Sequence, residues 1–114
     1  MKPKLNLGVL EVLQTIGDCT IDELVHYTGW NELQVRQELA RQKDSCAGDL
    51  ILEYVDPITN DSKYHMHSKA KQTPLEILNY FFNVTYQIRK KYGFNVGAKS
   101  KQKFKNEMEQ EIQP

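Results

Sequence analysis

The chain has 114 residues, of which 39% are hydrophobic and 26% are charged. This length allows one small domain, and the apolar fraction is sufficient for a packed core and too high for a disordered chain. No run of about 18 to 20 apolar residues is present, so the sequence predicts no membrane span and no membrane partner.

Acidic and basic residues are distributed unevenly along the chain. The formal net charge is zero, but residues 1–56 carry a net charge of −5 and residues 57–114 a net charge of +5. Residues 62–105 hold ten Lys and Arg residues against one acid, Glu76. This block predicts an electropositive surface that would attract a polyanion such as DNA. The alternative is a solvated, lysine-rich tail that binds no ligand.

Two helices are predicted in the first part of the chain. Apolar residues recur at spacings of three and four over residues 5–16, which predicts an amphipathic helix. A second helix is predicted to start after Thr20, because Thr20 and Glu23 form a capping-box pattern in which each side chain can bond the backbone amide of the other. Gly29 is expected to end this helix, since glycine adopts a left-handed backbone more readily than other residues.

A third helix is predicted over residues 31–43. Asn31 suits its N-cap position, and Val35 and Leu39 lie four residues apart and are expected to face the core. Two short helices joined by a tight turn that contains glycine form a helix-turn-helix arrangement.

The sequence period then changes to that of β-structure. Residues 50–55 are rich in β-forming residues, and residues 63–68 alternate in polarity. Residues 56–61 between them are dense in turn-forming residues. Together these segments predict a β-hairpin.

A further helix is predicted over residues 73–93. Thr73, Pro74 and Glu76 suit the N-cap, first and third helical positions. The apolar face of this helix is wider than a lone helix can hide, so it is expected either to cover the domain or to form a homodimer through residues 74–92. The residues predicted to form that interface are Leu78, Phe81, Phe82 and Thr85. Residues 94–114 are low in apolar content and are expected to form either a frayed helix or a disordered polar tail.

This order of elements resembles the winged helix-turn-helix superfamily over residues 5–70. The resemblance rests on the capped helix after Thr20, on Gly29 and Trp30 in the turn, and on Val35 and Leu39 in the third helix. The predicted fold class is therefore α+β and mostly helical, with three helices and a β-hairpin wing. The predicted units are a winged helix-turn-helix domain over residues 1–72, an added C-terminal helix over residues 73–93 and a polar tail over residues 94–114.

The resemblance implies binding of double-stranded DNA in transcriptional or replication control. In that family the third helix enters the major groove, and the wing contacts the DNA backbone or minor groove. Gln can bond adenine and Arg can bond guanine, while lysines on the wing add salt-dependent affinity. The implied DNA-binding residues are Asn31, Leu33, Gln34, Arg36, Gln37 and Arg41 on the third helix, and Lys63, His65, Lys69 and Lys71 on or after the wing.

Acidic residues on the same helix oppose this function. Glu32 and Glu38 would repel phosphate, and they are also spaced to pair with Arg36 and Arg41 as surface salt bridges. The alternative is a protein–protein interaction adaptor on the same fold, in which Leu33 and the helix over residues 74–92 contact a partner. The size would suit a small phage or prokaryotic regulator.

No pattern predicts an enzyme, a cofactor or a metal site. His65 and His67 alternate along one strand and are expected to be exposed, and no further ligands at zinc-like spacing accompany them. Cys19 and Cys46 form neither a CxxC pair nor a disulfide framework, which indicates a reducing, cytoplasmic environment.

Overall fold

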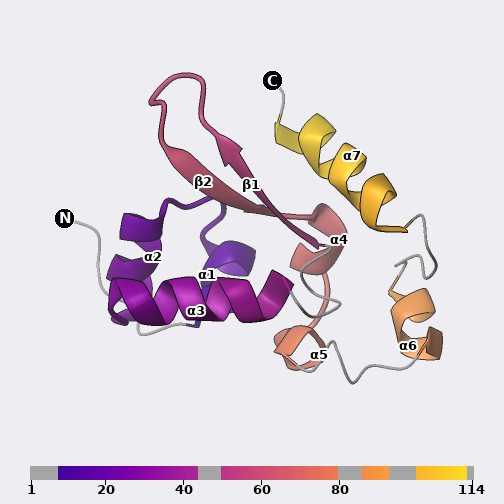
Figure 1. The fold of residues 1–114 in the computed structure, drawn as a ribbon. Helices are drawn as coiled ribbons and strands as arrows, with labels where there is room; N and C mark the ends of the chain where they lie inside the picture. The colour runs from indigo at the N-terminus through magenta and orange to yellow at the C-terminus, as the bar shows by residue number, and fades with distance from the viewer. Residues whose placement is uncertain (1–7, 44–49, 80–85, 93–99, 113–114) are drawn as a thin grey trace.

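The computed structural model describes residues 8–43, 50–79, 86–92 and 100–112 (Figure 1). The first three helices are α1 (Val9–Thr15), α2 (Ile21–Thr28) and α3 (Glu32–Lys43). A hairpin of β1 (Ile51–Val55) and β2 (Ser62–Met66) follows. The remaining helices are α4 (Ser68–Lys71), α5 (Leu75–Asn79), α6 (Tyr86–Lys91) and α7 (Ser100–Ile112). The predicted fold class, α+β and mostly helical, is confirmed at this level.

Local side-chain contacts set the limits of α2 and α3. The backbone amide of Glu23 donates to the Thr20 hydroxyl (3.1 Å), and the Thr20 amide donates to the Glu23 carboxylate (3.2 Å), which confirms the predicted capping box. Gly29 ends α2 with φ 75°, in the left-handed region. The amide of Gln34 donates to the Asn31 side chain (2.8 Å), so Asn31 caps α3 as predicted.

The core lies where α1, α2 and α3 meet the hairpin. Val35 and Leu39 of α3 are buried in it, as predicted, and they pack with Leu24 of α2 and Leu13 of α1. Burial of apolar side chains from the helices and the hairpin is the main source of stability in a domain of this size.

The hairpin is antiparallel, with Leu52 opposite His65 and Tyr54 opposite Lys63. The other edge of β2 is paired too, because Tyr64 exchanges backbone hydrogen bonds with Cys19 in the α1–α2 connection (2.8 and 3.2 Å). The β-structure of the described residues therefore has β2 in its interior and β1 at an edge.

The segment predicted as one helix over residues 73–93 contains α5 and α6, with residues 80–85 between them outside the described part. The Thr73 hydroxyl, predicted to cap this helix, instead donates to the Lys69 carbonyl oxygen of α4 (2.8 Å). Leu78 is buried in the core of its own chain, so it is not available for the predicted dimer interface. Phe81, Phe82 and Thr85 lie outside the described residues.

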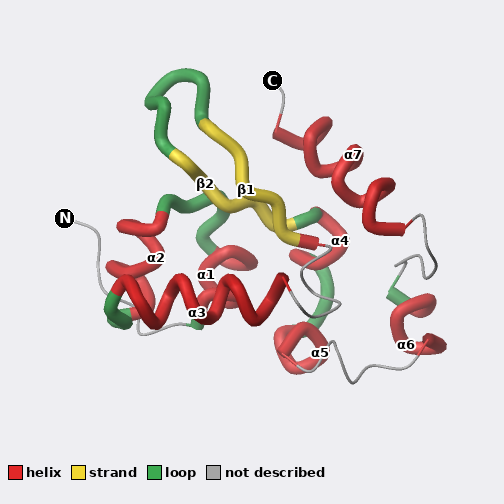
Figure 2. The backbone as a smooth tube through the Cα atoms, in the orientation of Figure 1, coloured by secondary structure: helices red, strands yellow, loops and turns green. Residues whose placement is uncertain are grey.

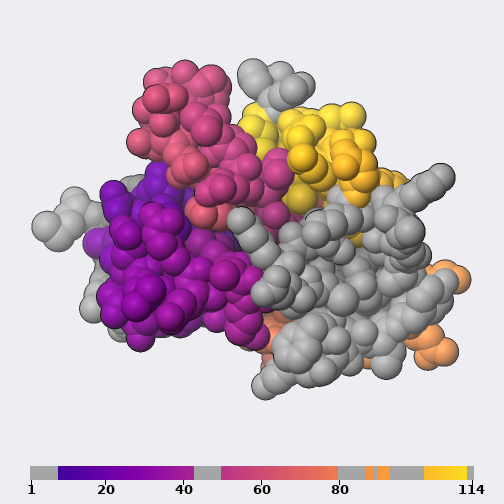
Figure 3. Space-filling view, in the orientation of Figure 1, coloured from indigo at the N-terminus to yellow at the C-terminus, as the bar shows by residue number. Residues whose placement is uncertain are grey.

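Residues 100–112, within the predicted polar tail, form the 13-residue helix α7. Of the two expected alternatives, the described part of the tail takes the helical one, and this helix is packed. Phe104 and Met108, four residues apart, are fully buried, with Phe104 at 0% exposure. The helix lies along the hairpin in the ribbon and tube views (Figures 1 and 2), and its atoms contact the hairpin in the space-filling view (Figure 3).

None of the helices in the described ranges is long and apolar enough to cross a bilayer.

We predict that Phe104→Ala lowers the free energy of unfolding by about 3 kcal/mol, because it removes a fully buried ring and leaves a cavity. Urea denaturation followed by circular dichroism measures the change. The matched control is Gln110→Ala on the exposed side of α7, which should stay within about 0.5 kcal/mol of the wild type. Equal stabilities of the two variants would contradict the packed position of α7.

Candidate functional site

The outward side of α3 is the first candidate surface. Leu33 is 64% exposed, and Arg36, Gln37 and Arg41 are exposed beside it on the same helix. Asn31 and Gln34 are exposed as well, but their side chains bond each other's backbone amides at the start of the helix. The structure thus brings the α3 residues together as predicted, with two of the six engaged in capping.

Both arginines of this surface are paired with carboxylates of the same helix. Arg36 contacts Glu32 (3.1 Å) and Arg41 contacts Glu38 (2.6 Å). The hydrogen bond from Arg41 holds the pKa of the Glu38 carboxyl below its usual value, despite partial burial. The positive charge of α3 is therefore largely compensated within the helix.

The hairpin offers little free positive charge. Lys63 forms an ion pair with Asp56 at the turn (2.8 Å), which raises the pKa of Lys63 and lowers that of Asp56. Lys69 lies 6.0 Å from the centre of the Phe104 ring, and Lys71 is half-buried where its charge acts on Asp18. The lysines predicted to hold phosphate are thus turned toward groups of their own chain.

A hollow of about 270 Å³ lies between α2, α3 and the hairpin. It is lined by Thr20, Ile21, Asp22, Glu32, Arg36, Asp61 and Ser62. Three carboxylates therefore face one guanidinium in the space between the third helix and the wing. Such a hollow repels an anion and favours a cationic group.

His65 and His67 are buried, so their prediction as exposed strand residues is wrong, and with it the assignment of His65 to DNA binding. His65 is 6% exposed, and its ring lies between two carboxylates, with Nδ1 2.7 Å from Asp18 and Nε2 2.7 Å from Glu111. The Nε2 atom of His67 contacts the Glu107 carboxylate, and its ring meets Phe104 edge to face at 5.2 Å. The reason is that α7, in the segment predicted to be a frayed helix or a disordered polar tail, covers this side of the hairpin.

We name the cluster of Asp18, His65, His67, Glu107 and Glu111 the histidine–carboxylate cluster. A histidine can donate from both ring nitrogens only as imidazolium, which suits the two carboxylates around His65. Burial lowers the pKa of His65, but the hydrogen bonds that its ring donates to Asp18 and Glu111 outweigh burial, and the pKa is raised. Burial raises the pKa of Asp18 and Glu111, and hydrogen bonds, including those of His65, outweigh it and lower both.

Two tyrosines near the cluster donate hydrogen bonds to carboxylates. The Tyr54 hydroxyl donates to Asp18 (2.6 Å), and the Tyr64 hydroxyl donates to Glu53 (2.7 Å). Burial and the Glu53 carboxylate raise the pKa of Tyr64 to about 12, and burial and the Asp18 carboxylate raise the pKa of Tyr54 as well. Both hydroxyls therefore remain protonated donors.

The cluster links the α1–α2 connection, the hairpin and α7. Each ring nitrogen of His65 already contacts a carboxylate, and no group of His, Cys, Asp and Glu in the described part of the chain has the arrangement to hold a metal ion. The sequence analysis missed Asp18, Glu107 and Glu111. The only signal was the spacing of Phe104, Glu107, Met108 and Glu111, which places them on one side of a helix.

Comparison with known proteins gives no relative: no family model, no curated protein and no solved structure matches the chain.

We predict that the chain is more stable near pH 6 than at pH 8. The raised pKa of His65 means that its contribution is complete below its unfolded value of about 6.5 and is lost as the pH rises through the folded value. The lowered pKa values of Asp18 and Glu111 mean that their contribution is lost only as the pH falls below the usual range of carboxyl groups, near pH 4. Chemical denaturation at both pH values measures the difference.

His65→Gln should remove most of this difference, and His26→Gln on α2 is the matched control that should keep it. If the His65 variant retains the full pH dependence, the stabilising role of the protonated imidazole is refuted.

Proposed function

We propose that this chain is a non-catalytic protein-interaction module with a winged-helix fold, and that the outward side of α3 and the neighbouring hairpin bind a basic protein surface. Three helices followed by a hairpin, with a capped α2 and a glycine turn before α3, support the winged-helix assignment.

The observation that carries the proposal is the charge of the space between α3 and the hairpin. Asp22, Glu32 and Asp61 line it against Arg36 alone, in the position where a winged helix that binds DNA meets the phosphate backbone. Lys63 is paired with Asp56 nearby. Because phosphate contacts supply most of the affinity for DNA, this surface favours a cationic protein ligand.

Apolar exposure on the two elements supports the same conclusion. Leu33 lies on the outward side of α3 at 64% exposure, and Ile58 at the hairpin turn is 92% exposed. Single exposed apolar residues are common on protein surfaces, but protein interfaces typically place apolar contacts within a polar, charged rim. Leu33 is flanked by the Glu32–Arg36 pair and fits that pattern.

Photo-crosslinking tests this proposal. A benzoylphenylalanine residue at position 33, in the cells that produce the chain, is expected to give a protein adduct that resists nuclease treatment. The matched control carries the same residue at position 76, which is exposed on α5. Nuclease-sensitive adducts at position 33, or equal adducts at both positions, would refute the proposal.

DNA binding is the second candidate, and the exposed Gln37 and Arg41 favour it. Surface ion pairs contribute only about 0 to 1 kcal/mol, so Arg36 and Arg41 could exchange Glu32 and Glu38 for phosphate. Fluorescence anisotropy with random duplex DNA at 50 and 200 mM salt tests DNA binding. If the chain binds DNA, the affinity should fall at the higher salt concentration, and Arg36→Ala and Gln37→Ala should each lower it. Our first proposal expects no binding at either salt concentration.

A further inference from the structure

The outer edge of β1 has backbone groups that no strand in the described part of the chain uses. In an antiparallel pair, residues alternate between those bonded to the partner strand and those whose backbone groups point away from it. At one end of the hairpin the His67 amide donates to the Leu50 carbonyl oxygen (2.8 Å), and at the other end the Asp56 amide donates to the Asp61 carbonyl oxygen (2.9 Å). In the observed register, the even-numbered residues of β1 are therefore the ones whose backbone groups bond β2. The N–H and C=O groups of Ile51, Glu53 and Val55 therefore point outward.

The partner strand confirms this phase. Tyr64, which lies opposite Glu53, directs its own backbone groups away from β1 and bonds Cys19. Among the described residues, no hydrogen bond is made to the outward backbone groups of Ile51, Glu53 or Val55. Pro57 has no N–H, so an added ladder would end after Val55.

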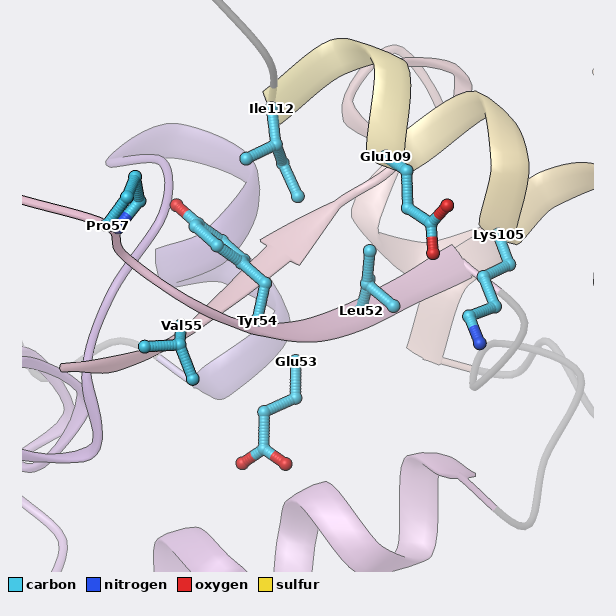
Figure 4. Close-up of a pocket in the computed structure, with 8 residues that line it drawn as sticks. All are labelled: Leu52, Glu53, Tyr54, Val55, Pro57, Lys105, Glu109 and Ile112. Carbon is cyan, nitrogen blue, oxygen red and sulfur yellow. The ribbon is translucent and has the colours of Figure 1, made fainter. Parts of the chain in front are cut away.

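A groove of about 580 Å³ follows this edge between β1 and α7 (Figure 4). It is lined by Leu52, Glu53, Tyr54, Val55 and Pro57 of the hairpin and by Lys105, Glu109 and Ile112 of α7. Leu52 and Tyr54 point toward α7, whereas Glu53 and Val55 point to the opposite side of the strand. Consecutive residues of one strand thus line the groove from both sides of the edge.

We propose that this edge binds an extended peptide of a partner protein as an additional β-strand. Its backbone would bond Ile51, Glu53 and Val55, as in other cases of strand addition to a sheet edge. The side chain of the peptide residue opposite Glu53 lies on the same face of the sheet as Glu53. The two neighbouring peptide residues lie opposite Leu52 and Tyr54, and their side chains lie on the face that α7 covers. The fitting sequence is apolar, basic, apolar.

Charge and packing determine these three positions. Glu53 is exposed and has no cationic partner among the described side chains, so a Lys or Arg opposite it gains a cross-strand ion pair. The neighbouring positions face Leu52, Tyr54 and Ile112, which offer apolar surface under α7.

A second copy of the chain is a poorer occupant of this edge. The symmetric antiparallel pairing that uses all three outward residues is centred on Glu53. It sets two carboxylates opposite each other, which is destabilising.

Selection of random linear heptapeptides displayed on phage, with the full chain as bait, tests the proposal. The enriched sequences are expected to share the apolar, basic, apolar alternation. A synthetic copy of the strongest one, followed by fluorescence anisotropy, should bind at least tenfold more weakly when the amide of its basic residue is N-methylated. This comparison uses the wild-type chain and so does not depend on the folding of any variant. Absence of enrichment, or unchanged affinity after N-methylation, would overturn the proposal.

Glu53→Lys should lower the affinity for the same peptide at least fivefold, and phage selection on this variant should enrich acidic residues at the central position. Glu76→Lys, the same charge change at an exposed site on α5, is the matched control and should leave affinity unchanged. A wild-type dimer in sedimentation that competes with the peptide would assign the edge to a second copy instead. Leu33→Glu should leave peptide binding intact, so failure here is distinguishable from failure of the proposed α3 surface.

Discussion

The packing of α7 depends on buried contacts of its carboxylates with His65 of β2 and with His67, which directly follows β2. His65 joins Glu111 of α7 to Asp18 in the α1–α2 connection, and His67 contacts Glu107 beside the Phe104 ring. A buried polar group without a partner would cost free energy, so these hydrogen bonds permit α7 to cover one side of the hairpin. The same helix then forms one wall of the groove along β1.

Features that rest on neighbouring residues in the chain were predictable. The Thr20–Glu23 capping box, the left-handed Gly29 and the cap by Asn31 each involve contacts within about one helical turn. The buried positions of Val35 and Leu39 followed from their spacing. These elements hold the outward side of α3 in place, so that part of the candidate site could be described from the sequence.

Features that rest on distant residues could not be predicted. His65 lies 47 residues from Asp18 and 46 from Glu111, and neither distance leaves a local pattern. The described tail brings few apolar side chains into the core, so composition favoured a polar segment. Phe104 and Met108 are nevertheless buried, because Glu107 and Glu111 on the same side of α7 meet buried histidines. The contacts of individual lysines could not be predicted for the same reason. The net charge of a segment gives the number of its lysines and does not indicate which carboxylate each lysine contacts.

The distribution of charge in the folded chain has a consequence for binding. Among the residues whose exposure the structure describes, the exposed lysines of the second half lie on α6 and α7, for example Lys90, Lys91 and Lys103, while Asp22, Glu32 and Asp61 line the hollow beside α3. The exposed, described lysines of the electropositive block therefore lie on elements other than α3 and the hairpin, the two that a winged helix would use for a nucleic acid. Under the proposed function, a partner with a basic surface would meet favourable electrostatics at the hollow beside α3. The zero net charge thus results from two regions of opposite sign, which can orient a partner before any short-range contact forms.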